Sequence, residues 1–68
     1  MNVLIIGSGA REHAFCWKLI ESQKITKIYV APGNAGTSKI AFNLNVDTLN
    51  FQELKNAILI HSINLVIV

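Results

Sequence analysis

The sequence has few of the residues that usually hold a small protein together. Its 68 residues include one cysteine, Cys16, which cannot form a disulfide within the chain. Together with the two histidines, His13 and His61, it does not give the paired spacing of a structural zinc site. Small chains bury little surface and often depend on disulfides, metals or association. We therefore expect the isolated chain to be poorly stable and to self-associate.

Charge and hydropathy exclude further classes of protein. Six Lys/Arg against four Asp/Glu give a net charge of +2, and the basic residues are scattered, which argues against nucleic-acid binding. Apolar runs such as Val3–Ile6 and Leu65–Val68 are too short to cross a membrane. The N-terminus lacks the basic segment and long apolar run of a secretory signal. We predict a cytoplasmic protein with no nucleic-acid or membrane partner.

The first half of the chain has the pattern of a strand, a helix and a second strand. Val3–Ile6, ending at Gly7, is typical of a strand buried on both faces of a parallel sheet. A helix is expected from about Arg11 to Ser22, and a second strand at Lys27–Ala31. The apolar arc of the helix is broad, so we expect it to pack on the sheet and on something else. That arc contains Phe15, Cys16, Trp17, Leu19 and Ile20.

The second half repeats the alternation. A short strand is expected at Leu44–Val46, and a capping box formed by Asn50 and Glu53 predicts a helix that ends near His61. Asn64–Val68 is a last apolar strand. The order predicts an α/β fold, a Rossmann-like open parallel sheet with right-handed crossovers, truncated after about four strands. We expect residues 1–68 to be a partial N-terminal domain. The buried face of the second helix is expected to contain Phe51, Leu54, Ala57 and Ile58.

The turn Gly7-Ser8-Gly9 joins the first strand to the first helix. Glycines let backbone amides approach a ligand closely, and the start of a helix attracts anions. The turn is therefore interpreted as a phosphate cradle, or alternatively as a tight connection that binds nothing. A dinucleotide site would need a third glycine, where Glu12 stands, and an acidic residue after the second strand, which ends at Pro32. Neither NAD, FAD nor a phosphate-loop nucleotide is expected.

Side chains of the first helix offer several interpretations. Arg11 could pair with a phosphate or be solvated. Glu12 could complement the helix dipole. His13 could touch a ligand or pack as a hydrogen-bonded side chain inside the protein. Cys16 is interpreted as a buried, inert thiol, and His61 as a side chain placed favourably at a helix C-terminus.

The segment Pro32-Gly33-Asn34-Ala35-Gly36-Thr37 is a second candidate loop. Two glycines, a proline and an asparagine in six residues require specific backbone geometry. Because the segment follows a strand, it should lie at the same rim of the sheet as Gly7–Gly9. The alternative is a simple connection with no ligand.

These two loops carry a resemblance to a known family. Gly7–Ala14 is similar to the G-x-G-G-R-E-H-A signature of phosphoribosylamine–glycine ligases, and Ala31–Thr37 is similar to their A-P-G-N-A-G-T. Trp17-Lys18 falls where the family often has the same pair, and Leu65–Val68 resembles the strand before its G-P-E motif. The resemblance covers the whole chain. One departure is Ala10, which replaces the second glycine of the family's G-G pair.

The resemblance implies an ATP-dependent carbon–nitrogen ligase of de novo purine biosynthesis. In such an enzyme ATP phosphorylates the carboxylate of glycine, and the amine of 5-phosphoribosylamine attacks the acyl phosphate to give glycinamide ribonucleotide. ATP and Mg²⁺ or Mn²⁺ serve the complete enzyme, whose ATP-grasp and C-terminal domains are absent from residues 1–68. This segment alone is expected to be inactive and to bind neither of them.

By the same resemblance the segment would hold the phosphoribosyl substrate, and no residue in it is a credible nucleophile or general base. Two other possibilities are a non-catalytic nucleotide-fold binding module and a non-functional truncated product. The residues expected to bind substrate are Gly7, Gly9, Arg11, Glu12, His13, Pro32, Gly33, Asn34 and Gly36.

Overall fold

A four-stranded parallel sheet is the centre of the molecule, and the computed structural model describes all of residues 1–68. The helices are α1 (Ala10–Leu19) and α2 (Phe51–Ile60), and a short 3₁₀ helix, η1, spans Thr37–Lys39. Each strand pairs in parallel with its neighbours in the order β3-β2-β1-β4. This confirms the predicted Rossmann-like sheet. The strands are β1 (Asn2–Gly7), β2 (Lys27–Pro32), β3 (Phe42–Asn43) and β4 (Leu65–Ile67).

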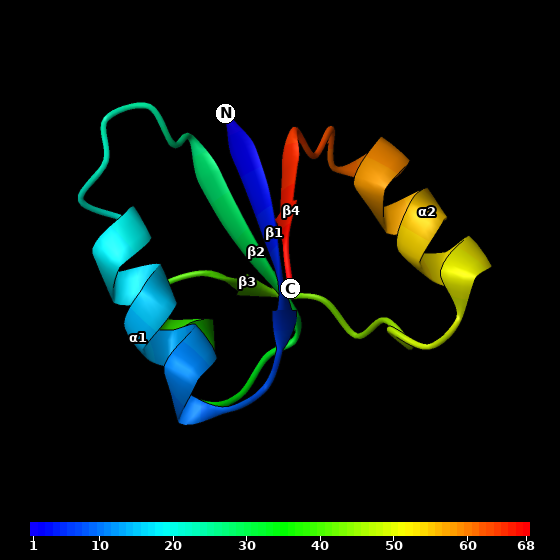
Figure 1. The fold of residues 1–68 in the computed structure, drawn as a ribbon, viewed down its shortest axis with the longest axis horizontal. Coiled ribbons are helices and arrows are strands. Elements are labelled where there is room, and N and C mark those ends of the chain that lie inside the picture. Colours follow the sequence, from blue (N-terminus) through cyan, green and yellow to red (C-terminus); the bar gives the residue numbers. More distant parts are fainter.

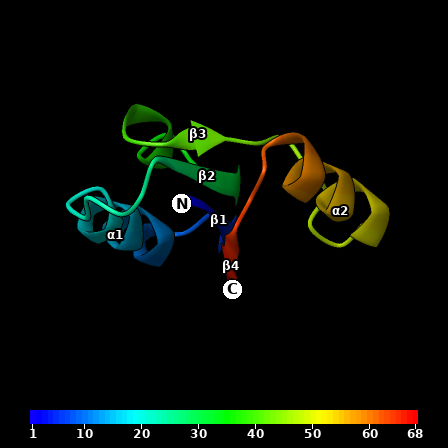
Figure 2. The same cartoon turned by 90° about the horizontal axis from the view of Figure 1, so that it is seen from above.

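The two long helices cover opposite faces of the sheet (Figures 1 and 2). From β1 the chain passes through α1 to β2 and then β3, and it returns through α2 to β4 on the other side of β1. The direction of winding therefore changes between β1 and β4. Open α/β sheets bind ligands at such a switch point, beyond the carboxyl ends of the strands. The turn after β1 and the loop after β2 both lie at that end.

Alternate residues of the strands build two apolar layers, as the two-residue period of a strand requires. One layer packs under α1 and the other under α2. Burial of such side chains contributes about 25 cal/mol per Å² of apolar surface removed from water. The α1 layer contains Val3, Ile5, Cys16, Ile28 and Val30. The α2 layer contains Leu4, Tyr29 and Ala31, with Leu54 and Ile58 packed against them.

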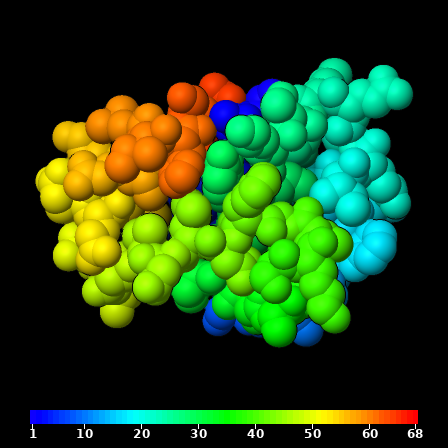
Figure 3. All heavy atoms as spheres, turned by 180° about the vertical axis from the view of Figure 1, so that it is seen from behind, coloured from blue at the N-terminus to red at the C-terminus, as the bar shows by residue number.

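The third strand is displaced from its predicted position at Leu44–Val46. Pairing with β2 instead joins Phe42 to Tyr29 and Asn43 to Val30, and the Leu44 amide adds one more bond, to the Val30 carbonyl at 2.8 Å. Hydrogen bonds of the Asn43 side chain with residues 34 and 37 fix this register. The segment with η1 and β3 lies along the β2 edge, as seen from behind in Figure 3.

Three predicted details of the helices are wrong or incomplete. Helix α1 ends at Leu19 rather than Ser22, and the sheet buries Cys16 but leaves Trp17 55% exposed. Phe51, expected in the buried face of α2, is 81% exposed, because α2 lies farther from the sheet at its first turn than at its last (Figure 1). Neither helix is long or apolar enough to span a membrane.

Only half of the predicted capping box forms at the start of α2. The Asn50 side-chain oxygen accepts from the amides of Gln52 and Glu53 at 3.0 and 3.2 Å. Glu53 does not reach back, and the Asn50 amide donates instead to the Asp47 carbonyl at 2.9 Å. The N-terminus of α2 is thus closed by a neutral side chain.

Candidate functional site

The two glycine-containing loops are hydrogen-bonded to each other at the carboxyl end of β1 and β2. The Gly33 amide donates to the Gly7 carbonyl at 3.0 Å. The side-chain amide of Asn34 donates to the carbonyls of Ser8 and Gly9 at 2.7 and 3.1 Å. The prediction that both loops share one rim of the sheet is confirmed.

Asn34 is the residue that joins the loops. In addition to the two bonds that its amide group donates, its side-chain oxygen accepts from the Thr37 amide at 2.9 Å, and its own backbone amide donates to Thr37 Oγ1 at 2.8 Å. Each polar atom of the side chain therefore already has a partner within the protein. Asn34 can serve a ligand by holding the Gly7–Gly9 turn in position.

Thr37 and Asn43 complete this network and were not among the predicted site residues. Thr37 is fully buried, and its hydroxyl lies 2.7 Å from Asn43 Oδ1. Asn43 Nδ2 donates to the Asn34 carbonyl at 2.8 Å. The one signal in the sequence was the threonine at the end of the loop motif. The partnership with Asn43 depends on the register of β3.

Two of the four glycines have a backbone that strongly favours glycine. Gly7 has φ 154° and Gly33 has φ 78°. A side chain on Gly7 would meet the Glu12 side chain, and one on Gly33 would meet the Asn43 side chain and, at 2.8 Å, Thr37 Oγ1. Ala10 has no positive φ, so its methyl group is tolerated at the start of α1.

The other two glycines have ordinary backbone angles. Gly9 is extended at φ −92°, so the reason for its glycine is space rather than conformation. Gly36 has φ −68°, and a Cβ there would lie 2.6 Å from Nδ1 of His13. His13 is half-buried against this glycine, and its ring makes no hydrogen bond. The packed histidine is confirmed, but the predicted hydrogen bond is absent.

The start of α1 presents a group of unpaired backbone amides, which we call the amide cluster. The amides of Ser8, Ala10, Arg11 and Glu12 make no hydrogen bond within the chain, and the first three of these residues are exposed. The N-cap is Gly9, which has no side chain to satisfy them. Unpaired amides at the positive end of a helix dipole are a favourable environment for an anion.

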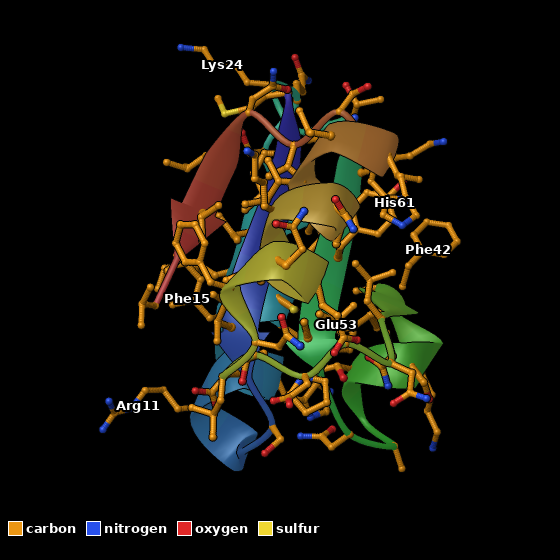
Figure 4. All side chains as sticks on the ribbon, turned by 90° about the vertical axis from the view of Figure 1, so that its right-hand side faces the viewer. Arg11, Phe15, Lys24, Phe42, Glu53 and His61 are labelled. Atoms are coloured by element: carbon orange, nitrogen blue, oxygen red, sulfur yellow. The ribbon has the colours of Figure 1, made fainter.

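A cavity of ≈ 250 Å³ adjoins the amide cluster, between the first turn of α1 and the end of β4. Its floor is apolar, and Arg11 and Glu12 are its polar residues. Arg11 is exposed and forms no ion pair, and Figure 4 shows its side chain extending away from the body of the molecule. The guanidinium is therefore free to meet an anion at the rim. Pro32, at the end of β2, is exposed beside the same loops.

Cys16 and His61 lie apart from the amide cluster. Burial raises the pKa of the Cys16 thiol, and the Glu12 carboxylate raises it further. His61 stacks on Tyr29 with ring centroids 4.6 Å apart, and Tyr29 also packs against Phe42 with ring centroids 5.5 Å apart; both His61 and Phe42 are labelled in Figure 4. Its carbonyl accepts from Asn2 Nδ2 at 3.1 Å, at the amino end of β1. No three His, Cys, Asp or Glu side chains come together as a metal site.

The Cys16 thiol should react slowly with a disulfide reagent. A raised pKa lowers the thiolate fraction at pH 8, and the side chain is fully buried. We expect modification of the native chain to be at least about tenfold slower than that of the urea-unfolded chain, since only the thiolate reacts. Because the pKa is higher when folded, charging of the thiol should cost stability as the pH rises through the unfolded value. Equal rates in both states would contradict the burial of Cys16.

Comparisons with known proteins agree with the motifs. The model of the family described as "Phosphoribosylglycinamide synthetase, N domain" matches residues 1–68. A phosphoribosylamine–glycine ligase of Rhizobium meliloti is 43% identical over 68 residues, which are 100% of this chain and 16% of that protein. A ligase of the same name from Rhodopirellula baltica is 56% identical over 46 residues, 68% of this chain and 10% of that protein.

A bifunctional purine biosynthetic protein of Saccharomyces cerevisiae is 42% identical over 73 residues, covering 98% of this chain and 9% of the yeast protein. The chain therefore spans a sixth or less of the length of these three relatives.

Proposed function

Because the chain belongs to the family of phosphoribosylglycinamide synthetase N domains, we propose that it holds the phosphoribosyl substrate of a phosphoribosylamine–glycine ligase. In this proposal the complete enzyme joins glycine to 5-phosphoribosylamine in purine biosynthesis, and it uses ATP to activate the carboxylate of glycine. Phosphoryl transfer is the chemistry that ATP and a divalent metal supply there. In this proposal those groups bind to parts of the enzyme outside residues 1–68.

The amide cluster at the start of α1 is the observation that carries the proposal. A phosphate group needs several hydrogen-bond donors and a positive potential, and helix N-termini supply both. Four unpaired amides lie at residues 8 and 10–12, at the switch point of the sheet. Arg11 adds a mobile cation, and the neighbouring cavity has room for part of a sugar beside the phosphate.

The second loop, Pro32–Thr37, supports this cluster through hydrogen bonds to the turn Gly7–Gly9. Gly33 and Asn34 bond to the carbonyls of residues 7, 8 and 9, which holds the turn in position. Gly36 leaves space for the His13 ring. In the proposal Gly7, Gly9, Arg11 and the α1 amides contact the substrate. Pro32, Gly33, Asn34 and Gly36 shape the rim.

The proposal is tested by Gly9→Val in a chimeric ligase, in which residues 1–68 replace the matching part of the Rhizobium meliloti enzyme. The extended backbone of Gly9 allows a side chain, but a Cβ there would lie 3.1 Å from Glu12 Oε2, and the branched side chain would fill the space above the turn. We expect the KM for phosphoribosylamine to rise at least about tenfold, the equivalent of about 1.4 kcal/mol. The KM values for ATP and glycine should stay unchanged.

Lys39→Ala is the control, because Lys39 is exposed at the end of η1 and takes no part in the network. It should leave all three KM values unchanged. If Gly9→Val also leaves the KM for phosphoribosylamine unchanged, the turn is only a connection between β1 and α1. A chimeric enzyme that is inactive even with the native turn would favour a non-catalytic binding module or a non-functional product.

A further inference from the structure

The Glu12 carboxylate lies beside the amide cluster. Glu12 Oε2 accepts from the Gly9 amide at 2.9 Å, and the side chain covers the face of Gly7 where a Cβ would otherwise stand. We propose that Glu12 is an internal anion that lies beside the cluster, on the Gly9 amide, in the ligand-free chain and is displaced from that amide when a phosphate group binds. This inference rests on the proposed function, and it adds a competing residue to that site.

The two helices of the chain differ in how they use the glutamate of the first turn. Both helices carry a glutamate in the first turn, Glu12 in α1 and Glu53 in α2. At α2 the neutral Asn50 side chain accepts from the amides of Gln52 and Glu53, and the Glu53 side chain makes no hydrogen bond. At α1 the N-cap is glycine, so the carboxylate itself turns back and becomes the partner of the Gly9 amide.

The charge of Glu12 is not neutralised by a neighbour. Arg11 is adjacent in sequence and lines the same cavity, but the chain has a single ion pair, between Lys18 and Glu21. Glu12 therefore brings to the start of α1 a negative charge that no ion pair offsets. Like charges placed together disfavour each other.

A phosphate that binds the cluster and also takes the neighbouring Gly9 amide has to replace the carboxylate there. The cavity beside the cluster, which Arg11 and Glu12 both line, has room for the rest of a ligand larger than a phosphate ion. Such competition weakens binding of a bare phosphate ion, which brings few other contacts. A sugar phosphate gains further contacts in the cavity that offset the displacement. Glu12 would thus select sugar phosphates over inorganic phosphate.

The test measures the affinities of inorganic phosphate and ribose 5-phosphate for three versions of residues 1–68: the native chain, Glu12→Gln and Glu53→Gln. The chemical shift of the Gly9 amide reports binding in each titration. Glutamine keeps an oxygen that can accept from Gly9 but loses the charge. We expect Glu12→Gln to bind inorganic phosphate about tenfold more tightly, with a smaller gain for ribose 5-phosphate. Glu53→Gln removes the same charge from the other helix and should leave both affinities unchanged.

The native chain gives a second readout that needs no substitution. The carboxyl carbon signal of Glu12 should shift with ligand at the same concentrations as the Gly9 amide, and that of Glu53 should not. Equal or weaker phosphate binding by Glu12→Gln would overturn the inference while leaving the proposed function intact, provided that ribose 5-phosphate still shifts the cluster. If neither ligand shifts the cluster in any of the three proteins, the proposed function and this inference are both wrong.

Discussion

Asn34→Ala should destabilise the chain by about 3 kcal/mol. The substitution removes three hydrogen bonds of the side chain, to the carbonyls of Ser8 and Gly9 and from the amide of Thr37. Each such bond contributes about 0.5–1.5 kcal/mol. Because small domains have little stability to spare, we expect a large unfolded population at 25 °C. Urea denaturation followed by circular dichroism measures the change.

Asn45→Ala is the matched control for this substitution. Asn45 is exposed, and its side chain makes no hydrogen bond, so its loss should change stability by less than about 0.5 kcal/mol. Asn34→Asp is the more specific variant, because it keeps an acceptor for Thr37 but offers no donor to the two carbonyls. We expect it to be at least as destabilising as alanine. A stable Asn34→Asp protein would show that the bonds between the loops contribute little.

Gly33→Val should also destabilise the chain by about 3 kcal/mol and separate the two loops. With φ 78°, a side chain at this position pays the cost of the left-handed backbone, about 1–2 kcal/mol. The new atoms would also overlap with the side chains of Asn43 and Thr37, and overpacking adds about 1–3 kcal/mol. The Leu44 amide, which bonds to β2, should then exchange faster with solvent.

Ala35→Val provides the comparison for Gly33→Val. Ala35 is exposed in the same loop and has no positive φ, so valine there should be tolerated within about 0.5 kcal/mol. Similar urea midpoints for the two variants would mean that the loop can adjust to a side chain at position 33. The requirement for glycine would then be absent.

Much of the fold is predictable because it depends on local pattern. β1 and β2 follow from short apolar runs rich in β-branched residues, and α2 starts where Asn50 caps it. The position of β3, in contrast, does not follow from a local pattern in the sequence. Its residues pair where the Asn43 side chain meets Thr37 and Asn34, and these are contacts between distant residues that no local pattern contains.

The candidate site was predictable in part for the same reason. The glycine turn and the second loop are recognisable in the sequence, and their common rim follows from the topology of a parallel sheet. The specific need for glycine is at positions 7 and 33 rather than at 9, which depends on backbone angles that only the structure gives. The contact of Glu12 with Gly9 was also unforeseen, since a glutamate in a first turn can equally well remain free, as Glu53 does.

Amide shifts of the 68-residue chain during titration with ribose 5-phosphate test most directly whether the amide cluster receives the phosphoribosyl group. The amides of residues 8–12 should shift together and saturate at one ligand concentration. The amides at the start of α2, residues 50–53, should stay in place, because Asn50 already closes that helix. Saturating shifts at residues 50–53, or none at residues 8–12, would contradict the assignment of the phosphoribosyl site to the start of α1.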